Sequence, residues 1–130
     1  MSTDTEFVHL AWRRDEGELA DVKFKMAADP TGNLSRLFGV YDPETGLALR
    51  GSFIISPDGI LLNSEMNFYD VGRNIDELMR LFKANLYISK KDNEAVPASW
   101  RDEGDKTLVN PGAAMVGRVH EALYDPRLEA

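Results

Sequence analysis

A tight turn between two apolar runs is the feature that most constrains how this chain folds. The runs SFII (52–55) and ILLNSEM (60–66) are separated by a turn in the sequence SPDG, residues 56–59. Pro57 suits the second position of a β-turn, and Gly59 can take the positive φ that such turns often require. The two runs are therefore predicted to pair as a hairpin of two antiparallel strands.

An amphipathic segment follows this hairpin. Asn74 and Glu77 form the N-x-x-E pair that is typical of a helix start. Apolar residues then recur at helical spacing, which predicts a long helix with one buried face; they are Ile75, Leu78, Leu81, Phe82 and Leu86.

The residues before the hairpin carry weaker signals of the same two kinds. Asp4 is placed to cap a first helix. Residues 22–27 alternate between apolar and charged side chains, which predicts a half-buried strand. A short helix is predicted over 34–38, ending at Gly39. Because strand and helix signals alternate along the chain, the predicted fold class is α/β.

The periodicity fades after Ser89. The polar segment KKDNEAVPASWRDEGDK covers residues 90–106, and within it Pro97 restricts the preceding residue to extended angles while Trp100 offers a large apolar anchor. A weak amphipathic stretch at 115–123 follows. The predicted organisation is a core of residues 1–88 and a C-terminal arm of residues 89–130.

Composition narrows the classes of function. The 130 residues are 43% hydrophobic, which suits one domain, and the net charge of −7 disfavours nucleic acid and anionic membranes as partners. No apolar run is long enough to span a membrane, and residues 1–20 are charged throughout. The sequence therefore predicts a cytoplasmic protein without nucleic-acid or membrane partners.

The sequence contains no cysteine. This excludes disulfides, thiolate metal sites and any thiol chemistry that the chain could perform alone. His9 and His120 are isolated histidines without metal-ligand spacing, so both are expected to be structural or exposed. The carboxylates at positions 102, 103 and 105 are expected to be a solvated charge run. No metal and no cofactor are predicted.

Five blocks of the chain occur in an order shared with a known family. They are STDTEFVHLAW (2–12), DPTG (29–32), LRGSFIISPDG (49–59), VGRNIDELMR (71–80) and VPASW (96–100). Together they resemble the second half of a typical two-cysteine peroxiredoxin of the alkyl hydroperoxide reductase type, and the resemblance runs from Ser2 to about Leu123. It implies the C-terminal half of a thioredoxin-like fold and an antioxidant peroxidase activity.

Both cysteines of that family are missing. The resemblance implies that a peroxidatic cysteine lies in a Pro-x-x-x-Thr-x-x-Cys motif on the half that precedes the STDT block, and that Val96 occupies the position of a resolving cysteine. Peroxide reduction needs a thiolate to attack the O–O bond. The chain alone is therefore expected to be inactive.

Arg50 and Arg73 are the candidate site residues. The resemblance implies that the Arg50 guanidinium points at the peroxidatic sulfur and the peroxide oxygens, where it stabilises negative charge. It implies that Arg73 braces the active-site helix through a carboxylate on the missing half. From the residues alone, both positions also fit solvated arginines, one at a strand start and one at a helix start.

Two functions stay open. The preferred one is the non-cysteine subunit of a split peroxiredoxin, which reduces hydroperoxides with a cysteine-bearing partner. The alternative is a catalytically inactive, peroxiredoxin-like binding or regulatory module. An unrelated enzyme ranks last, because the sequence offers no nucleophile and base pair, phosphate loop or metal set.

The resemblance also implies partners. They are a complementary peroxiredoxin N-terminal-half chain or a full-length peroxiredoxin, with further assembly through strand 60–66 and the 2–12 region. In the family's sheet, two central strands absent from this chain would separate a strand at 22–27 from the hairpin. The fold is therefore expected to be completed by a partner chain.

Overall fold

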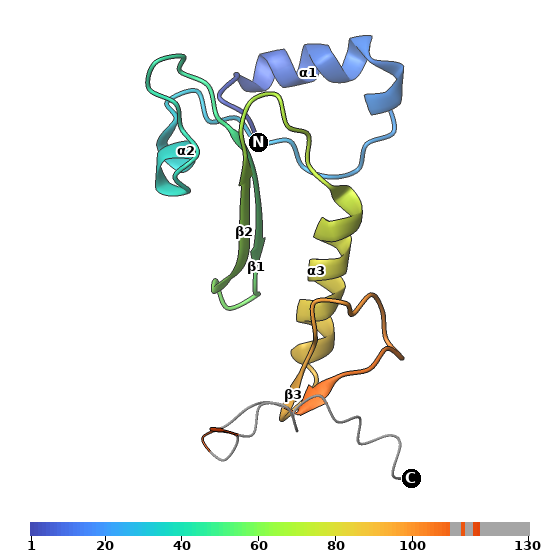
Figure 1. The fold of residues 1–130 in the computed structure, drawn as a ribbon. Helices are drawn as coiled ribbons and strands as arrows, with labels where there is room; N and C mark the ends of the chain where they lie inside the picture. The colour runs from blue at the N-terminus through green and yellow to red at the C-terminus, as the bar shows by residue number, and fades with distance from the viewer. Residues whose placement is uncertain (110–112, 114–115, 118–130) are drawn as a thin grey trace. The chain divides into compact units, whose positions relative to one another are not determined.

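The computed structural model describes residues 1–109, 113 and 116–117 (Figure 1). The chain divides into two compact units: a first unit of residues 1–53 with 64–73, and a second unit of residues 54–63 with those from 74 onward. The predicted segment 115–123 lies outside the described residues except at 116 and 117, and His120 lies outside them entirely. The division into a core and an arm at residue 88 stays a prediction.

The first unit begins with helix α1 (Glu6–Asp15), which is followed by the short 3-10 helix η1 (Gly17–Leu19). The prediction that Asp4 caps α1 is wrong. Thr5 is the capping residue because it has extended backbone angles and its hydroxyl accepts a hydrogen bond from the Val8 N–H. The Asp4 carboxylate instead accepts a hydrogen bond of 2.7 Å from the Ser2 hydroxyl.

The predicted strand at 22–27 is also wrong. The nearest pairing is an isolated parallel bridge between Ser2 and Ala28. A strand exists only where a neighbouring strand satisfies its backbone groups, and within the described residues no strand pairs with 22–27. Alternating side chains alone could not supply that neighbour.

Helix α2 (Asn33–Leu37) lies one residue before the predicted position of 34–38, and Gly39 follows it with a positive φ of 70°. The buried Asp29 carboxylate accepts hydrogen bonds from the N–H groups of Leu34 and Ser35 at 3.2 and 2.8 Å. Asp29 therefore satisfies backbone donors at the start of this helix.

The predicted hairpin is confirmed. Strand β1 (Arg50–Ile55) pairs with strand β2 (Leu61–Asn67) in a two-stranded sheet (Figure 1). The turn is closed by the Ser56 N–H, which donates to the Ile60 carbonyl at 2.8 Å, and Gly59 has a φ of 81°. Local turn chemistry was sufficient to locate both strands within two residues of their ends.

The second unit is built on helix α3 (Ile75–Ile88). Asn74 caps it as predicted, since its side chain accepts a hydrogen bond of 3.1 Å from the Glu77 N–H. The capping box is only half formed, because the Glu77 carboxylate binds Arg80 at 2.7 Å.

The segment after α3 is more ordered than the sequence predicted. Strand β3 (Glu94–Ala95) pairs antiparallel with β4 (Leu108–Val109), and Asn93 before β3 takes a φ of 62°, which asparagine tolerates well. Trp100 is 1% exposed, as expected for an apolar anchor, and its ring centroid lies 5.6 Å from that of Tyr87.

Among residues 1–109, few large apolar side chains are fully buried. Trp100 is the largest of the buried ones, whereas Phe7, Phe24 and Phe68 are 73%, 67% and 69% exposed. Among the described residues, every helix is too short or too polar to cross a membrane.

Candidate active site

Arg50 is exposed at the first residue of β1. The chain reaches it through a narrow turn over residues 40–49, in which the Leu49 N–H donates to the Val40 carbonyl at 2.7 Å and the Asp42 N–H donates to the Leu47 carbonyl at 2.8 Å. The position of the Arg50 backbone is therefore set by this turn and by the start of the hairpin.

Arg73 lies at the end of the loop that follows β2, and its Nη1 donates to the Gly51 carbonyl at 3.5 Å. The structure thus brings the two predicted arginines onto one cavity of about 360 Å³ in the first unit. Its walls are the N-terminal residues, the end of the 40–49 turn, and the loop after β2: Met1, Ser2, Thr3, Asp4, Leu47, Ala48, Leu49, Arg50, Gly51, Tyr69 and Arg73.

Gly51, between Arg50 and the buried Ser52, has a steric role. A Cβ atom at this position would lie 2.7 Å from the Phe53 ring and 2.9 Å from Val40 Cγ1. A glycine therefore keeps the strand close to Val40 at the point where Arg73 reaches the backbone.

The third wall of the cavity comes from the N-terminal segment. Ser2 Oγ lies 2.6 Å from His9 Nε2, and His9 is 6% exposed. This contact supports the expected structural role of His9. Sequence reasoning did not assign residues 2–4 or Tyr69 to the site, although the STDT block was a signal for the former.

The arrangement of Ser2, Asp4 and His9 does not form a catalytic triad. In a triad, the carboxylate orients the histidine through the ring nitrogen that does not face the serine. Here the Asp4 carboxylate accepts from Ser2, and His9 Nδ1 has no hydrogen-bond partner. The residues 1–109, 113 and 116–117 also hold no group of three or more His, Asp or Glu side chains suited to a metal ion.

What the cavity offers chemically is positive charge. Two guanidinium groups line it beside one carboxylate, that of Asp4. A guanidinium lowers the pKa of a neighbouring thiol and stabilises negative charge that develops on an oxygen. The cavity can therefore stabilise an anionic sulfur or peroxide oxygen supplied from outside this chain.

Val96 is half-buried in the second unit, where it lines a different cavity of about 310 Å³ together with Leu62, Arg80 and Pro97. Its isopropyl group has no redox chemistry. Nothing in this position can replace a resolving thiol.

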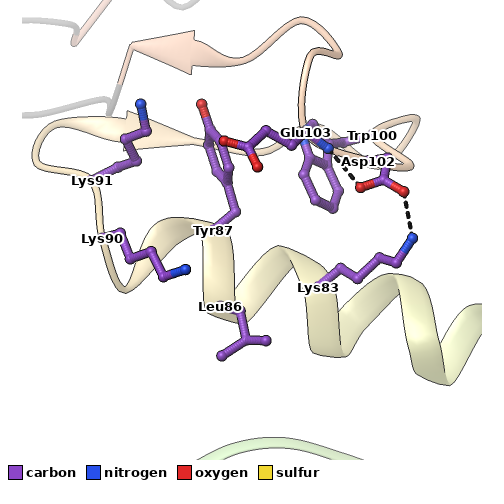
Figure 2. A pocket seen from close by; sticks show the side chains of 8 residues that line it. All are labelled: Lys83, Leu86, Tyr87, Lys90, Lys91, Trp100, Asp102 and Glu103. Atoms are coloured by element: carbon purple, nitrogen blue, oxygen red, sulfur yellow. Dashed lines mark hydrogen bonds and ion pairs between the residues drawn. The ribbon is translucent and has the colours of Figure 1, made fainter.

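The charged residues at 102, 103 and 105 are exposed, as predicted, and two of them also make contacts within the second unit. Lys83 pairs with Asp102 and lowers the pKa of that carboxyl, and both side chains border a small cavity beside Trp100 and Tyr87 (Figure 2). The Asp105 carboxylate accepts a hydrogen bond of 2.6 Å from the Arg101 N–H. These contacts fix the loop around Trp100.

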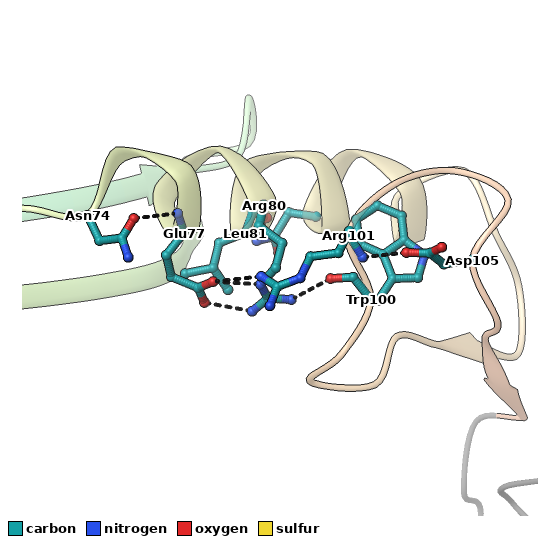
Figure 3. A network of polar contacts seen from close by, with 8 residues as sticks. Asn74, Glu77, Arg80, Leu81, Trp100, Arg101 and Asp105 are labelled. Atoms are coloured by element: carbon teal, nitrogen blue, oxygen red, sulfur yellow. Dashed lines mark hydrogen bonds and ion pairs between the residues drawn. The ribbon is translucent and has the colours of Figure 1, made fainter.

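A second network holds the same loop on α3 (Figure 3). Arg80 binds the Glu77 carboxylate through two nitrogens at 2.7 Å and donates to the Trp100 carbonyl at 3.2 Å. The hydrogen bond from Arg80 lowers the pKa of Glu77. Arg101 adds a longer contact of 4.0 Å to the same carboxylate.

Solved structures with a similar arrangement of helices and strands show that the fold is thioredoxin-like, of the peroxiredoxin type. AhpC of Enterococcus faecalis is 38% identical with a TM-score of 0.70, over 74% of this chain and 57% of that one. The reduced 2-Cys peroxiredoxin of Plasmodium vivax is 25% identical with a TM-score of 0.75, over 82% of this chain and 55% of that one.

Sequence comparison identifies the family that this chain resembles. Residues 1–64 match the AhpC/TSA family, and alkyl hydroperoxide reductase C of Staphylococcus aureus (strain NCTC 8325) is 43% identical over 119 residues, 92% of this chain. The chain is thus similar to the AhpC/TSA family of peroxiredoxins, and its sequence has no cysteine. It spans 62% of the length of that relative. The predicted resemblance and fold are confirmed.

Proposed function

We propose that this chain is the non-cysteine subunit of a split peroxiredoxin, which reduces hydroperoxides with a cysteine-bearing partner. The observation that carries the proposal is the shared cavity of Arg50 and Arg73 in a chain that resembles peroxiredoxins but has no thiol. This chain supplies the positive charge, and the partner supplies the sulfur.

The chemistry assigns one step to the two chains together. The partner's thiolate attacks the terminal oxygen of the hydroperoxide, the O–O bond breaks, and the sulfur becomes a sulfenic acid while the leaving alkoxide takes up a proton. The Arg50 guanidinium stabilises the thiolate and the charge on the departing oxygen. Arg73 supports this arrangement from its contact with the Gly51 carbonyl and braces the partner's active-site helix.

Return of the sulfenic acid to a thiol cannot use this chain. The resemblance puts Val96 at the resolving position, and the sequence has no cysteine anywhere. The second sulfur must come from the partner or from a small-molecule reductant. A trapped mixed disulfide that includes this chain would contradict this part of the proposal.

The partner is a complementary peroxiredoxin N-terminal-half chain or a full-length peroxiredoxin. The exposed apolar surface of α1 and the exposure of Ile60, Leu61 and Met66 at 60%, 52% and 55% support a chain that needs such cover. Further assembly is proposed through strand 60–66 and the 2–12 region. The predicted cytoplasmic location stays a prediction.

Light scattering after size-exclusion chromatography, with thermal unfolding, tests this need for a partner. The chain alone is expected to lack a cooperative unfolding transition and to gain one with its partner. A stably folded monomer of 14.6 kDa would contradict it.

Reconstitution tests the activity. The chain alone is expected to consume no hydrogen peroxide or organic hydroperoxide above a blank with dithiothreitol, because it has no thiol. Mixed with a peroxiredoxin N-terminal half that carries the Pro-x-x-x-Thr-x-x-Cys motif, it should raise the rate above that of either part. The same half with its cysteine changed to serine is the matched control.

The alternative function is a catalytically inactive, peroxiredoxin-like binding or regulatory module. The absence of any cysteine favours it. A complex that forms with the cysteine-bearing half but gains no peroxidase rate would select this alternative.

A further inference from the structure

Tyr69 connects the two loops that carry the candidate arginines. Its ring lines the cavity with Arg50 and Arg73, and its hydroxyl donates to the Asp42 carboxylate. The same hydroxyl lies 3.1 Å from Thr45 Oγ1. All five residues belong to the first unit.

The Asp42 end of this contact is held firmly by the 40–49 turn. One carboxylate oxygen accepts from the Glu44 N–H at 2.9 Å, and the other accepts from the Thr45 hydroxyl at 2.9 Å. This turn leads directly to Arg50. An acceptor that is already fixed by its own turn is a suitable anchor for a second loop.

The Tyr69 end belongs to the loop of residues 68–72, which leads directly to Arg73. The Asn67 side chain donates to the Gly72 carbonyl at 2.8 Å, which closes the base of the loop. Tyr69 fastens the other part of the loop to the turn. Without this contact, the loop would keep its base while losing its link to the segment before Arg50.

We propose that Tyr69 is a positioning residue, whose hydrogen bond to Asp42 sets the relative placement of Arg50 and Arg73. The inference rests on the proposed function, in which these arginines stabilise the partner's thiolate and the peroxide. Tyr69 acts only through the arginines, because its hydroxyl is engaged with Asp42.

Two measurements on Tyr69→Phe test the proposal. The first is the rate at which phenylglyoxal modifies Arg50 and Arg73 in the chain assembled with the peroxiredoxin N-terminal half, followed by peptide mass spectrometry. Loss of the contact should raise the rate at Arg73 by about threefold or more, since one hydrogen bond restrains the loop. The second is peroxidase kinetics of the reconstituted complex, where kcat should fall roughly tenfold with KM within about twofold.

Tyr87→Phe is the matched control. Tyr87 lies in the second unit and donates to Glu94 at 2.8 Å, so its loss should leave both arginine rates and kcat unchanged. Asp42→Ala should reproduce the loss seen in Tyr69→Phe, and the double variant Asp42→Ala with Tyr69→Phe should be little worse than either.

The two measurements separate this inference from the proposed function. Unchanged phenylglyoxal rates in Tyr69→Phe would overturn the positioning role whatever the activity. Altered phenylglyoxal rates with an unchanged kcat would show that the placement of the arginines by Tyr69 does not affect the peroxidase reaction. If the unsubstituted chain supports no peroxidase activity with a cysteine-bearing half, the proposed function fails, while the phenylglyoxal rates still decide whether Tyr69 positions the arginines.

Discussion

The loop around Trp100 and the cavity around Arg50 are held in contrasting ways. Trp100 is 1% exposed, and Arg80, Lys83 and Arg101 all contribute charged contacts that hold its loop on α3. Arg50 is exposed, and the contact between Arg73 and Gly51 is long at 3.5 Å. The first region stabilises structure, whereas the second leaves two guanidinium groups available for a group from outside the chain.

The largest expected effect tests the buried side of this comparison. Trp100→Ala should destabilise the loop on α3 by about 3–5 kcal/mol, because it removes a fully buried aromatic side chain and leaves a cavity. Hydrogen exchange of the amides in residues 75–109 in the assembled protein would measure it.

Trp12→Ala is the matched control. Trp12 is 51% exposed on α1, so its loss should change the stability of the Trp100 loop in the assembled protein by no more than about 0.5 kcal/mol. Equal losses of stability in Trp100→Ala and Trp12→Ala would mean that burial of Trp100 does not stabilise its loop. Weaker binding of the partner by Trp12→Ala would place the partner on α1.

Arg50→Ala tests the functional side. The peroxidase rate of the reconstituted complex should fall by about 100-fold or more, the scale of losing one preorganised charge that stabilises the transition state. Arg14→Ala, which removes an exposed arginine in the last turn of α1, is the control and should keep the rate. An unchanged rate in Arg50→Ala would contradict the site assignment.

Arg80→Ala should release the Trp100 loop by a smaller amount. It removes the charged hydrogen bonds to Glu77 and to the Trp100 carbonyl from a side chain that is 12% exposed. Cleavage by trypsin after Arg101 should become roughly tenfold faster. Lys83→Ala, which breaks an ion pair whose side chains are 44% and 62% exposed, should accelerate it by less than ~3-fold. The reverse order would mean that surface charge holds the loop.

The smallest expected effect is a loss of stability of the Trp100 loop at low pH. The hydrogen bond from Arg80 lowers the pKa of Glu77 below its ordinary value in the folded chain. The stabilisation from this pair is therefore fully present above the ordinary pKa of glutamate and is lost as the pH falls through the lowered value. Hydrogen exchange of the Trp100 loop should accelerate in that range, and Glu77→Gln should remove this component. An identical acid profile in Glu77→Gln would exclude the pair as its cause.

The parts of the fold that could be predicted depend on neighbours in sequence. The hairpin follows from Pro57 and Gly59, and the start of α3 follows from Asn74, because turns and caps are made by residues a few positions apart. The strand predicted at 22–27 failed for the opposite reason. Its alternation described one face of a strand but carried no information about a partner.

The candidate site divides in the same way. Arg50, Arg73 and Val96 were found through blocks that resemble a family, and the comparisons confirm this resemblance. Tyr69 was missed, since its contact with Asp42 joins positions 27 residues apart and follows no periodic pattern. The charged residues at 102 and 105 are exposed, as predicted, but their contacts with Lys83 and with the Arg101 N–H were missed, because the fold of the loop defines these partners.

The sequence by itself determined the resemblance to peroxiredoxins and the absence of cysteine from these 130 residues, since family blocks and residue composition need no coordinates. Only the tertiary structure decided that Arg50 and Arg73 line one cavity, that Arg73 contacts Gly51, and that Tyr69 links their loops. These contacts form because the hairpin brings the 40–49 turn and the loop after β2 close together. Contacts between distant positions arise from packing and backbone hydrogen bonding of the whole unit, which local residue patterns do not encode.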